Sequence, residues 1–261
     1  MPAKVRADQL LVIRGLAESR TRAQALILAG NVFAGDRRIG KAGDMLAEDT
    51  ELMVKGRDHP WVSRGGIKLD HGLAHFGFDV AGAVCLDVGS STGGFTDVLL
   101  SRGAAKVYAV DVGTNQLAWK LRSDPRVIVC EQTNARELTG DIIPEPVDVV
   151  VCDASFISIA KVLDRALDLA RRGAKLVALV KPQFEAGREE VGKGGVVRNP
   201  EVHRRVCETA AEWVRDKAWE VLGIEQSPIT GPEGNVEFLL GAVKTNAGEP
   251  GAGVLCQGPQ E

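Results

Sequence analysis

The sequence predicts an α/β protein in two parts: a domain built on a mostly parallel sheet, preceded by a small α+β module. From residue 83 onward, short apolar runs alternate with helical patterns, as in a parallel sheet that helices cover on both faces. A glycine-rich turn follows the first of these runs. The first 56 residues have a different pattern, and 261 residues suffice for one α/β core and a small module.

The N-terminal module is predicted over residues 1–56. Apolar residues at helical spacing predict short helices over 6–14 and 21–29. Ser19 is a suitable N-cap for the second helix, and Gly30 ends it. Short strands joined by Gly and Asp turns are expected at 32–34, 38–39 and 51–54.

A Pro- and Gly-containing connector over residues 57–66 should lead into the second domain, which we place at 67–245. Strands of this domain are expected at 84–88, 106–110, 127–130, 147–152, 175–180, 219–226 and 236–243. Helices are expected at 67–76, 94–102, 116–121, 161–171 and 200–217. The Gly- and Pro-rich tail, residues 246–261, is predicted to be disordered.

Composition excludes several classes of protein. None of the five cysteines stands in a CxxC pair, so a disulfide framework or a zinc site is not expected. No segment has the roughly 18–20 apolar residues that a membrane-spanning helix needs, and no signal peptide opens the sequence. We therefore expect a cytoplasmic protein without a membrane partner.

The net charge of −3 argues on its own against a polyanionic partner. The average hides a local excess of basic residues, however. Residues 1–70 contain 12 Lys and Arg against 9 Asp and Glu, whereas residues 71–261 contain 20 against 26. Nucleic acid therefore remains a possible partner of the N-terminal module.

The glycine-rich turn is the most informative segment. It runs from Asp87 to Thr96, after an apolar strand and before a helix, where nucleotide-like ligands bind in an open parallel sheet. Its glycines fit neither the GxGxxG dinucleotide pattern nor the GxxxxGK[ST] phosphate loop. Asp111 ends the second strand, where a carboxylate can accept hydrogen bonds from a ribose diol.

The DxGxxxGG form of this turn resembles the first motif of class I, Rossmann-like methyltransferases. The resemblance implies a seven-stranded, mostly parallel sheet with an antiparallel last strand, and S-adenosyl-L-methionine as cofactor. Asn134 would meet the adenine side of the pocket, or it is an ordinary loop residue. The residues expected to bind the cofactor are Asp87, Gly89, Ser90, Thr92, Gly93, Gly94, Phe95, Asp111, Asn134 and Asp153.

Four further polar residues are expected at the same edge of the sheet: Lys68, Asp153, Lys181 and Glu237. In this order they resemble the Lys-Asp-Lys-Glu tetrad of the FtsJ/RrmJ family of RNA ribose methyltransferases, which implies that they are catalytic. A ribose hydroxyl must lose its proton as it attacks a methyl group. Lys181 is the candidate base; alternatively, it orients the hydroxyl and stabilises its developing negative charge.

No metal is expected to take part, because a sulfonium donor already activates the methyl group. His71 and His75 are four residues apart, the spacing of helical metal ligands, but no third ligand or HExxH pattern accompanies them. We interpret them as part of a solvated helix face.

The N-terminal module, with its helical string, Gly30 and basic turn, resembles an S4-type RNA-binding domain. Phe33 is its only aromatic residue, so recognition should depend on shape and backbone rather than on base stacking. The residues expected to contact RNA are Arg6, Arg20, Arg22, Arg37, Arg38, Lys41 and Arg64.

An S4-type module joined to an FtsJ-like domain resembles the TlyA family. This implies 2'-O-methylation of cytidine in small- and large-subunit ribosomal RNA, within assembled subunits, and an effect on capreomycin sensitivity. Members are often labelled haemolysins, so one alternative is a membrane-active, pore-forming protein. Another is a non-catalytic ribosome-binding factor. The sequence does not indicate an oligomeric state.

Overall fold

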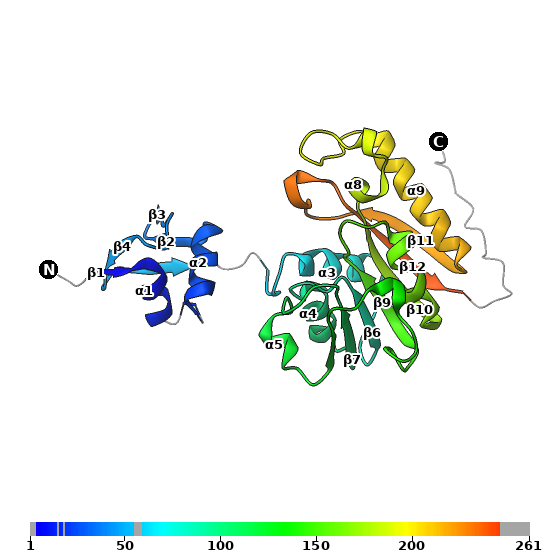
Figure 1. Cartoon of the computed structure of the whole chain (residues 1–261), viewed down its shortest axis with the longest axis horizontal. Helices are drawn as coiled ribbons and strands as arrows, with labels where there is room; N and C mark the ends of the chain where they lie inside the picture. The colour runs from blue at the N-terminus through cyan, green and yellow to red at the C-terminus, as the bar shows by residue number, and fades with distance from the viewer. Residues whose placement is uncertain (1–3, 15, 18, 55–58, 246–261) are drawn as a thin grey trace, which may run out of the picture. The chain divides into compact units, whose positions relative to one another are not determined.

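The computed structural model describes the chain except for residues 1–3, 15, 18, 55–58 and 246–261. The tail at 246–261, which we predicted to be disordered, lies outside the described residues. The chain divides into two compact units, residues 1–60 and 61–261 (Figure 1).

The first unit is a small α+β fold. Its described elements are β1 (Lys4–Arg6), α1 (Ala7–Ile13), α2 (Arg20–Leu28), β2 (Val32–Ala34), β3 (Arg37–Arg38), β4 (Met45–Ala47) and β5 (Leu52–Val54). β2 lies between β3 and β5 in one antiparallel sheet, and β1 pairs with β4 in another. The two helices bury apolar side chains such as Leu10, Leu11 and Ile27 in a common core. The predicted cap is confirmed, because the Ser19 side chain accepts a hydrogen bond from the backbone N–H of Arg22.

The second unit is an α/β domain with a seven-stranded sheet. Its strands are β6 (Val84–Val88), β7 (Lys106–Val110), β8 (Val127–Cys130), β9 (Val147–Cys152), β10 (Ala170–Val180), β11 (Trp219–Gln226) and β12 (Phe238–Lys244). Its helices, 3-10 helices included, are α3 (Gly65–His75), α4 (Gly94–Ser101), α5 (Trp119–Arg122), η1 (Ala135–Glu137), α6 (Ile159–Val162), α7 (Asp164–Asp168), α8 (Pro182–Glu185), η2 (Arg188–Glu190), α9 (Pro200–Asp216) and η3 (Pro232–Gly234).

The strand order is β11-β12-β10-β9-β6-β7-β8. β12 runs antiparallel to both of its neighbours, and the pairs from β10 to β8 are parallel. The predicted seven-stranded sheet with an antiparallel last strand is therefore confirmed. Because β12 is reversed, its first residues lie at the edge where the parallel strands end.

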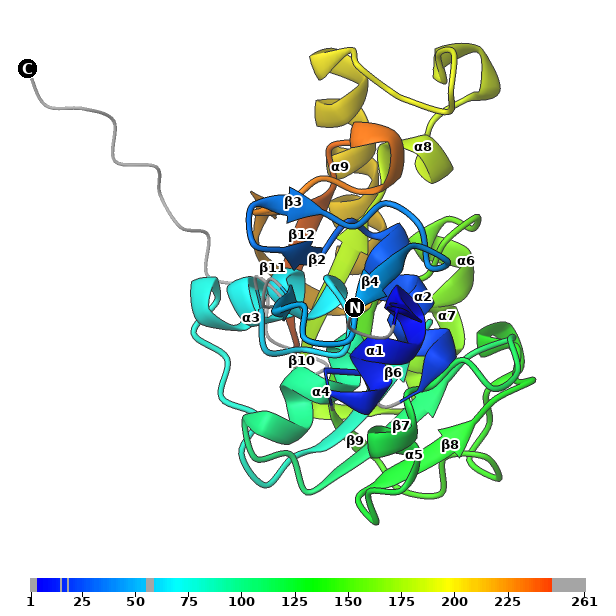
Figure 2. The same ribbon diagram turned by 90° about the vertical axis from the view of Figure 1, so that its left-hand side faces the viewer.

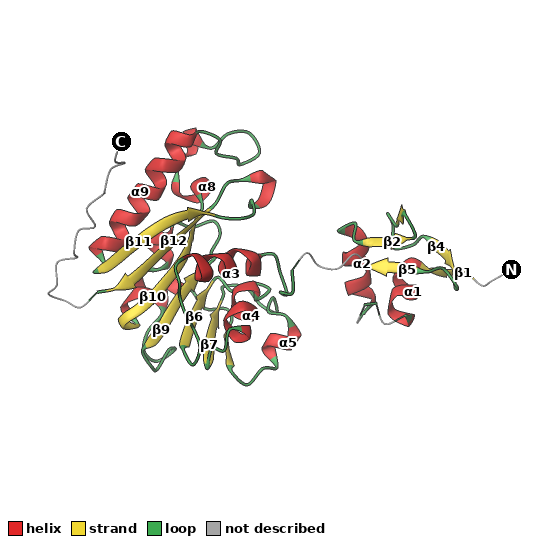
Figure 3. Cartoon of the chain, turned by 180° about the vertical axis from the view of Figure 1, so that it is seen from behind, coloured by secondary structure: helices red, strands yellow, loops and turns green. Residues whose placement is uncertain are grey.

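Helices cover both faces of the sheet (Figure 3). Alternate residues of each strand point to opposite faces. Cys85 and Val151 contribute to the core beneath α3 and α4, whereas Leu86 and Val150 contribute to the core beneath α6, α7 and α9. The long helix α9 packs beside β11 (Figures 1 and 2). Within the described residues, no helix combines the length and the apolarity needed to cross a membrane.

Residues 61–66, which we expected in the connector, belong to the second unit. Trp61 and Val62 pack against the core beneath α3 and α4 because both side chains are large and apolar. The backbone N–H of Val62 also donates to Asp97 Oδ2 at 2.8 Å. The helix predicted at 161–171 is divided into α6 and α7 and ends at Asp168, because Ala170 already pairs with Val147 of β9.

Candidate functional site

The turn after β6 has a backbone that only glycine accommodates at two points. Gly89 and Gly93 have φ of +82° and +98°, in the left-handed region that L side chains rarely adopt. A Cβ on Gly89 would lie 2.8 Å from Ala154 Cα, and one on Gly93 would lie 2.3 Å from Leu121 Cδ1. The turn is therefore pressed against the segment that follows β9 on one side and against α5 on the other.

A cavity of about 450 Å³ opens beside this turn, at the ends of four parallel strands. Four of the predicted cofactor residues line it: Gly89, Asp111, Asn134 and Asp153. The Asp111 carboxylate accepts hydrogen bonds from the backbone N–H groups of Ser91 at 2.8 Å and Gly113 at 2.7 Å, so its position at the rim is fixed.

The composition of this cavity fits a nucleoside cofactor. Val110, Ile157 and Val162 provide apolar walls for a planar base, and Asp111 provides a carboxylate for a ribose diol. Gly89 lines the cavity, and without a side chain it lets the turn approach the backbone of Ala154 closely.

The other predicted cofactor residues are not among those that line the cavity: Asp87, Ser90, Thr92, Gly93, Gly94 and Phe95. Asp87 has no exposed surface. Its Oδ2 accepts a hydrogen bond from Thr96 Oγ1 at 2.6 Å, while its Oδ1 has no partner among the described residues. Burial raises the pKa of Asp87 to about 7, although the Thr96 hydrogen bond opposes this shift.

The four tetrad residues form two ion pairs at the same edge of the sheet. Lys68 Nζ lies 2.5 Å from Glu237 Oε2, and Lys181 Nζ lies 2.6 Å from Asp153 Oδ1. Lys68, Lys181 and Glu237 are 8%, 6% and 1% exposed. Ionised groups with so little access to water are costly to bury unless they are paired, and here each ammonium has a carboxylate.

Strand register explains why residues so distant in sequence meet. Val180 pairs with Phe238, so Lys181 and Glu237, the next residues outward, lie side by side. The backbone N–H of Asp153 donates to Val88 O at 3.1 Å, which places Asp153 beside the glycine-rich turn. Helix α3 brings Lys68, and a Cβ on Gly65 in its first turn would lie 3.4 Å from Asp153 Oδ2.

Two residues that we did not predict complete this site. Ser155 Oγ accepts a hydrogen bond from Lys181 Nζ at 3.1 Å. Phe156 lines the cavity, is 89% exposed and has φ of +66°. Its ring lies 5.0 Å from that of Phe184. A large exposed aromatic side chain on a strained backbone is unusual, and nothing in the sequence marked this position in advance.

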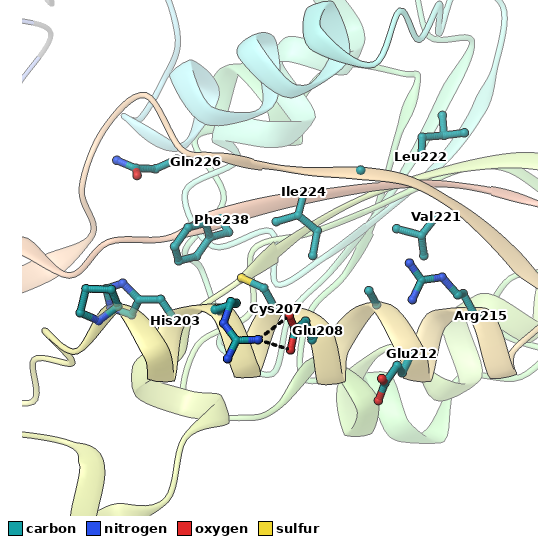
Figure 4. Close-up of a pocket in the computed structure, with 14 residues that line it drawn as sticks. His203, Cys207, Glu208, Glu212, Arg215, Val221, Leu222, Ile224, Gln226 and Phe238 are labelled. Atoms are coloured by element: carbon teal, nitrogen blue, oxygen red, sulfur yellow. Dashed lines mark hydrogen bonds and ion pairs between the residues drawn. The ribbon is translucent and has the colours of Figure 1, made fainter. Parts of the chain in front are cut away.

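A larger cavity, of about 710 Å³, lies between α9 and β11 (Figure 4). Its charged side chains include Arg204, which forms an ion pair with Glu208 across one turn of α9. It is lined by α9, the edge strand β11 and Phe238 of β12 rather than by the ends of parallel strands. The smaller cavity beside the glycine-rich turn is therefore the better candidate for the active site.

The predicted RNA-contacting residues fall into two groups. Arg6 and Arg20 both pair with the carboxylate of Asp8, which is itself buried. The hydrogen bond from Arg6 is the largest of several contacts that hold the pKa of Asp8 well below its usual range. The second group is on the surface: Arg37, Arg38, Lys41 and Arg64 are exposed, and Arg22 is half-buried. Arg64 belongs to the second unit, directly before α3.

Comparison with known proteins agrees with the cofactor site that the geometry indicates. The family model for FtsJ-like methyltransferases matches residues 61–244. A 16S/23S rRNA (cytidine-2'-O)-methyltransferase TlyA of Mycobacterium tuberculosis is 49% identical over 92% of this chain and 90% of its own length. Hemolysin A of Brachyspira hyodysenteriae is 39% identical over 90% of this chain and 98% of its own length.

A solved structure from Streptococcus thermophilus, provisionally named a hemolysin, is 44% identical with a TM-score of 0.74. It covers 94% of this chain, which covers 90% of it. Solved structures of S-adenosylmethionine-dependent methyltransferases share the fold of the second unit. The protein is an enzyme with S-adenosylmethionine as its cofactor. The chain belongs to the FtsJ-like methyltransferase family and, within it, to the TlyA group.

Proposed function

We propose that this enzyme methylates the 2'-hydroxyl of cytidine ribose in ribosomal RNA of both the small and the large subunit. The observation that supports this most directly is the pair of buried Lys–carboxylate contacts beside the cofactor cavity. The similar M. tuberculosis protein is named for the same reaction on 16S and 23S rRNA. A ribose hydroxyl is a weak acid, and such groups can take up its proton or stabilise the charge that it develops.

S-adenosylmethionine, when bound, supplies a methyl group made electrophilic by its sulfonium. Asp111 would hold the ribose of the cofactor, and the turn around Gly89 would accommodate its methionine part. The chain's own side chains then have to position one RNA hydroxyl and manage its proton.

Lys181 is the central residue in this proposal. Its Nζ donates to Asp153 Oδ1, to the Asp153 backbone carbonyl at 3.1 Å and to Ser155 Oγ at 3.1 Å. Three acceptors match the three donors of an ammonium group, so a hydroxyl that Lys181 orients would take the place of one of them. This arrangement favours Lys181 as the group that orients the hydroxyl and stabilises its negative charge, whereas a base would have to be a neutral amine.

Lys68 and Glu237 would act as a positioning pair next to Lys181. Glu237 is almost fully buried, and its Oε2 is bound to Lys68 Nζ at 2.5 Å. Because Glu237 lies beside Lys181 in the strand register, its charge also helps to hold Lys181 in place.

Phe156 would receive the target nucleotide. Its exposed ring at the mouth of the cavity offers a surface on which a base turned out of its stack can lie. Aromatic stacking does not distinguish strongly among bases, so this contact would hold the nucleotide rather than select cytidine.

The first unit would bind the RNA as an S4-type domain. Arg22, Arg37, Arg38 and Lys41 would contact phosphates, with Arg64 contacting RNA from the second unit. Arg6 and Arg20 hold Asp8 in the folded unit and would meet RNA only through their remaining donors.

The direct test is transfer of labelled methyl from S-adenosylmethionine to purified 30S and 50S subunits, followed by mapping of the modified nucleotide. Lys181→Ala should reduce incorporation at least a hundredfold while calorimetry still detects cofactor binding.

Lys181→Arg distinguishes a base from a cation that orients the hydroxyl. An arginine cannot act as a base but retains donors and charge, so residual turnover supports orientation by a cation. Full activity of Lys181→Ala would refute the proposal.

Relatives named hemolysins suggest a second candidate, a membrane-active protein. Lysis of erythrocytes by purified protein distinguishes the two. If the wild type and Lys181→Ala lyse cells equally and neither methylates RNA, the second candidate replaces the first.

A further inference from the structure

A cluster of metal-ligating side chains lies outside the active site. His71 and His75 are one turn apart on α3, and Glu225 reaches them from the edge strand β11. One ligand atom from each residue lies within 4.8 Å of the other two. The sequence had indicated no third ligand, because Glu225 is separated from the histidines by 150 residues and meets them only through packing of β11 beside α3.

We propose that His71, His75 and Glu225 form a binding site for one divalent transition-metal ion of the zinc type. Two imidazoles and one carboxylate are the donors of three-ligand zinc sites, in which water takes the remaining position. Mg²⁺ and Ca²⁺ prefer oxygen ligands, so a site with two nitrogen ligands favours zinc over them.

The distances agree with a shared ion better than with a hydrogen bond. His71 Nε2 lies 3.8 Å from Glu225 Oε1, too far for a hydrogen bond. Two ligands of a tetrahedral zinc ion with bonds of about 2.0–2.2 Å lie about 3.4 Å apart, so a small movement brings both into its coordination sphere. The rings of His71 and His75 are 6.1 Å apart and inclined by 27°, which leaves both facing the same side of α3.

An independent observation also points to a ligand. His71 Nε2 is a buried atom that forms no hydrogen bond within the described part of the chain. Buried ring nitrogens are normally satisfied, and an ion would supply the missing partner. The surroundings are open enough for water, because the side chains of His71 and Glu225 are 37% and 38% exposed.

The site would join α3, which carries Lys68, to β11, the strand that pairs with β12 just after Glu237. His71 follows Lys68 by three residues on α3, so the two side chains lie on neighbouring turns. Glu225 pairs with Leu239, two residues after Glu237. A bound ion would therefore fix the edge strand to α3 close to the Lys68–Glu237 pair.

The test uses the full chain and Zn²⁺ alone as the probe, with Mg²⁺ for comparison. Calorimetry should show one Zn²⁺ per chain. Free Zn²⁺ at about ten times its Kd should raise Tm by about 3–6 °C, and Mg²⁺ should cause no shift. His75→Ala and Glu225→Gln should each lower the Zn²⁺ affinity at least tenfold, as should His71→Ala. His75 is exposed, so its replacement should leave the fold intact.

Two matched variants serve as controls. Glu220→Gln changes an exposed carboxylate of β11 outside the cluster, and His203→Ala removes a histidine of α9. Both should bind Zn²⁺ like the wild type. Absence of binding by the wild type, or equal binding by His75→Ala and Glu225→Gln, overturns the proposal. So does loss of binding when Cys130 and Cys256 are replaced by Ser, because thiols would then be the ligands.

Discussion

Among single residues, Asp87 shows how burial determines the protonation of a side chain. It is completely buried beneath the glycine-rich turn, and its pKa rises from 3.8 to about 7, chiefly because burial disfavours the charged form. Between these two values the folded protein retains a proton that the unfolded chain has lost. The free energy of unfolding should therefore fall as pH rises from about 4 to about 7, and it should level off above that range.

Asp87→Asn should remove this dependence, because an amide is neutral at every pH and still offers an oxygen to Thr96. Urea unfolding of both proteins at pH 5, 6, 7 and 8 measures the difference directly. The variant should gain stability relative to the wild type as pH rises. Asp141→Asn, at an exposed position, is the control and should leave the slope unchanged. A difference between Asp87→Asn and the wild type that stays constant with pH would disprove this account.

The tetrad shows what residue patterns can and cannot reveal. Lys68, Asp153, Lys181 and Glu237 could be selected from the sequence, because parallel strands end at one edge and because their order resembles the FtsJ/RrmJ tetrad. Which lysine pairs with which carboxylate could not be predicted, since it depends on the register of β10 with β12 and on where α3 begins. The exposure of Phe156 likewise depends on its φ of +66°, for which its residue type gives no warning.

Among the secondary-structure elements, α9 begins with an N-cap whose contribution to the free energy of unfolding can be measured. Asn199 caps the helix by accepting a hydrogen bond from the backbone N–H of Glu201 at 3.0 Å, and Pro200 occupies the first turn. Asn199→Ala should lower the free energy of unfolding by about 1 kcal/mol, while Asn199→Gly should cost only a few tenths. The urea midpoints of the three proteins provide the measurement. Equal losses for both variants would mean that the side-chain cap is not the cause.

Central strands of the α/β domain, such as β6 and β9, were predictable because each is a short, nearly continuous apolar run buried on both faces. The elements that departed from expectation are those that tertiary contacts define. β10 begins at Ala170 because of an irregular pairing with β9, and β1 with β4 involves three residues each, too few to show a pattern. Residues 61–66 look like a connector, yet Trp61 makes them part of the second unit.

At the scale of the whole molecule, charge is divided between the two units. The chain has a net charge of −3, yet Arg22, Arg37, Arg38 and Lys41 belong to one small unit. Among the described ion pairs, none involves these four residues. Cations without a protein partner are available for phosphates, whereas Arg6 and Arg20 are engaged with Asp8.

Replacing these four residues with Ala should therefore weaken binding to ribosomal subunits and make it less dependent on salt. Each lost phosphate contact lowers the slope of log K against log salt by about 0.7–0.9, or about 3 for all four. Cofactor affinity should not change, because the cavity belongs to the other unit. Filter binding from 50 to 300 mM salt gives the slope.

Arg204→Ala, which removes a paired cation of α9, should leave the slope unaltered. Arg20→Ala should mainly lower the free energy of unfolding, because it removes a partner of buried Asp8, and it should change the slope little. If the fourfold variant keeps the wild-type slope, the RNA-binding surface lies elsewhere on the chain.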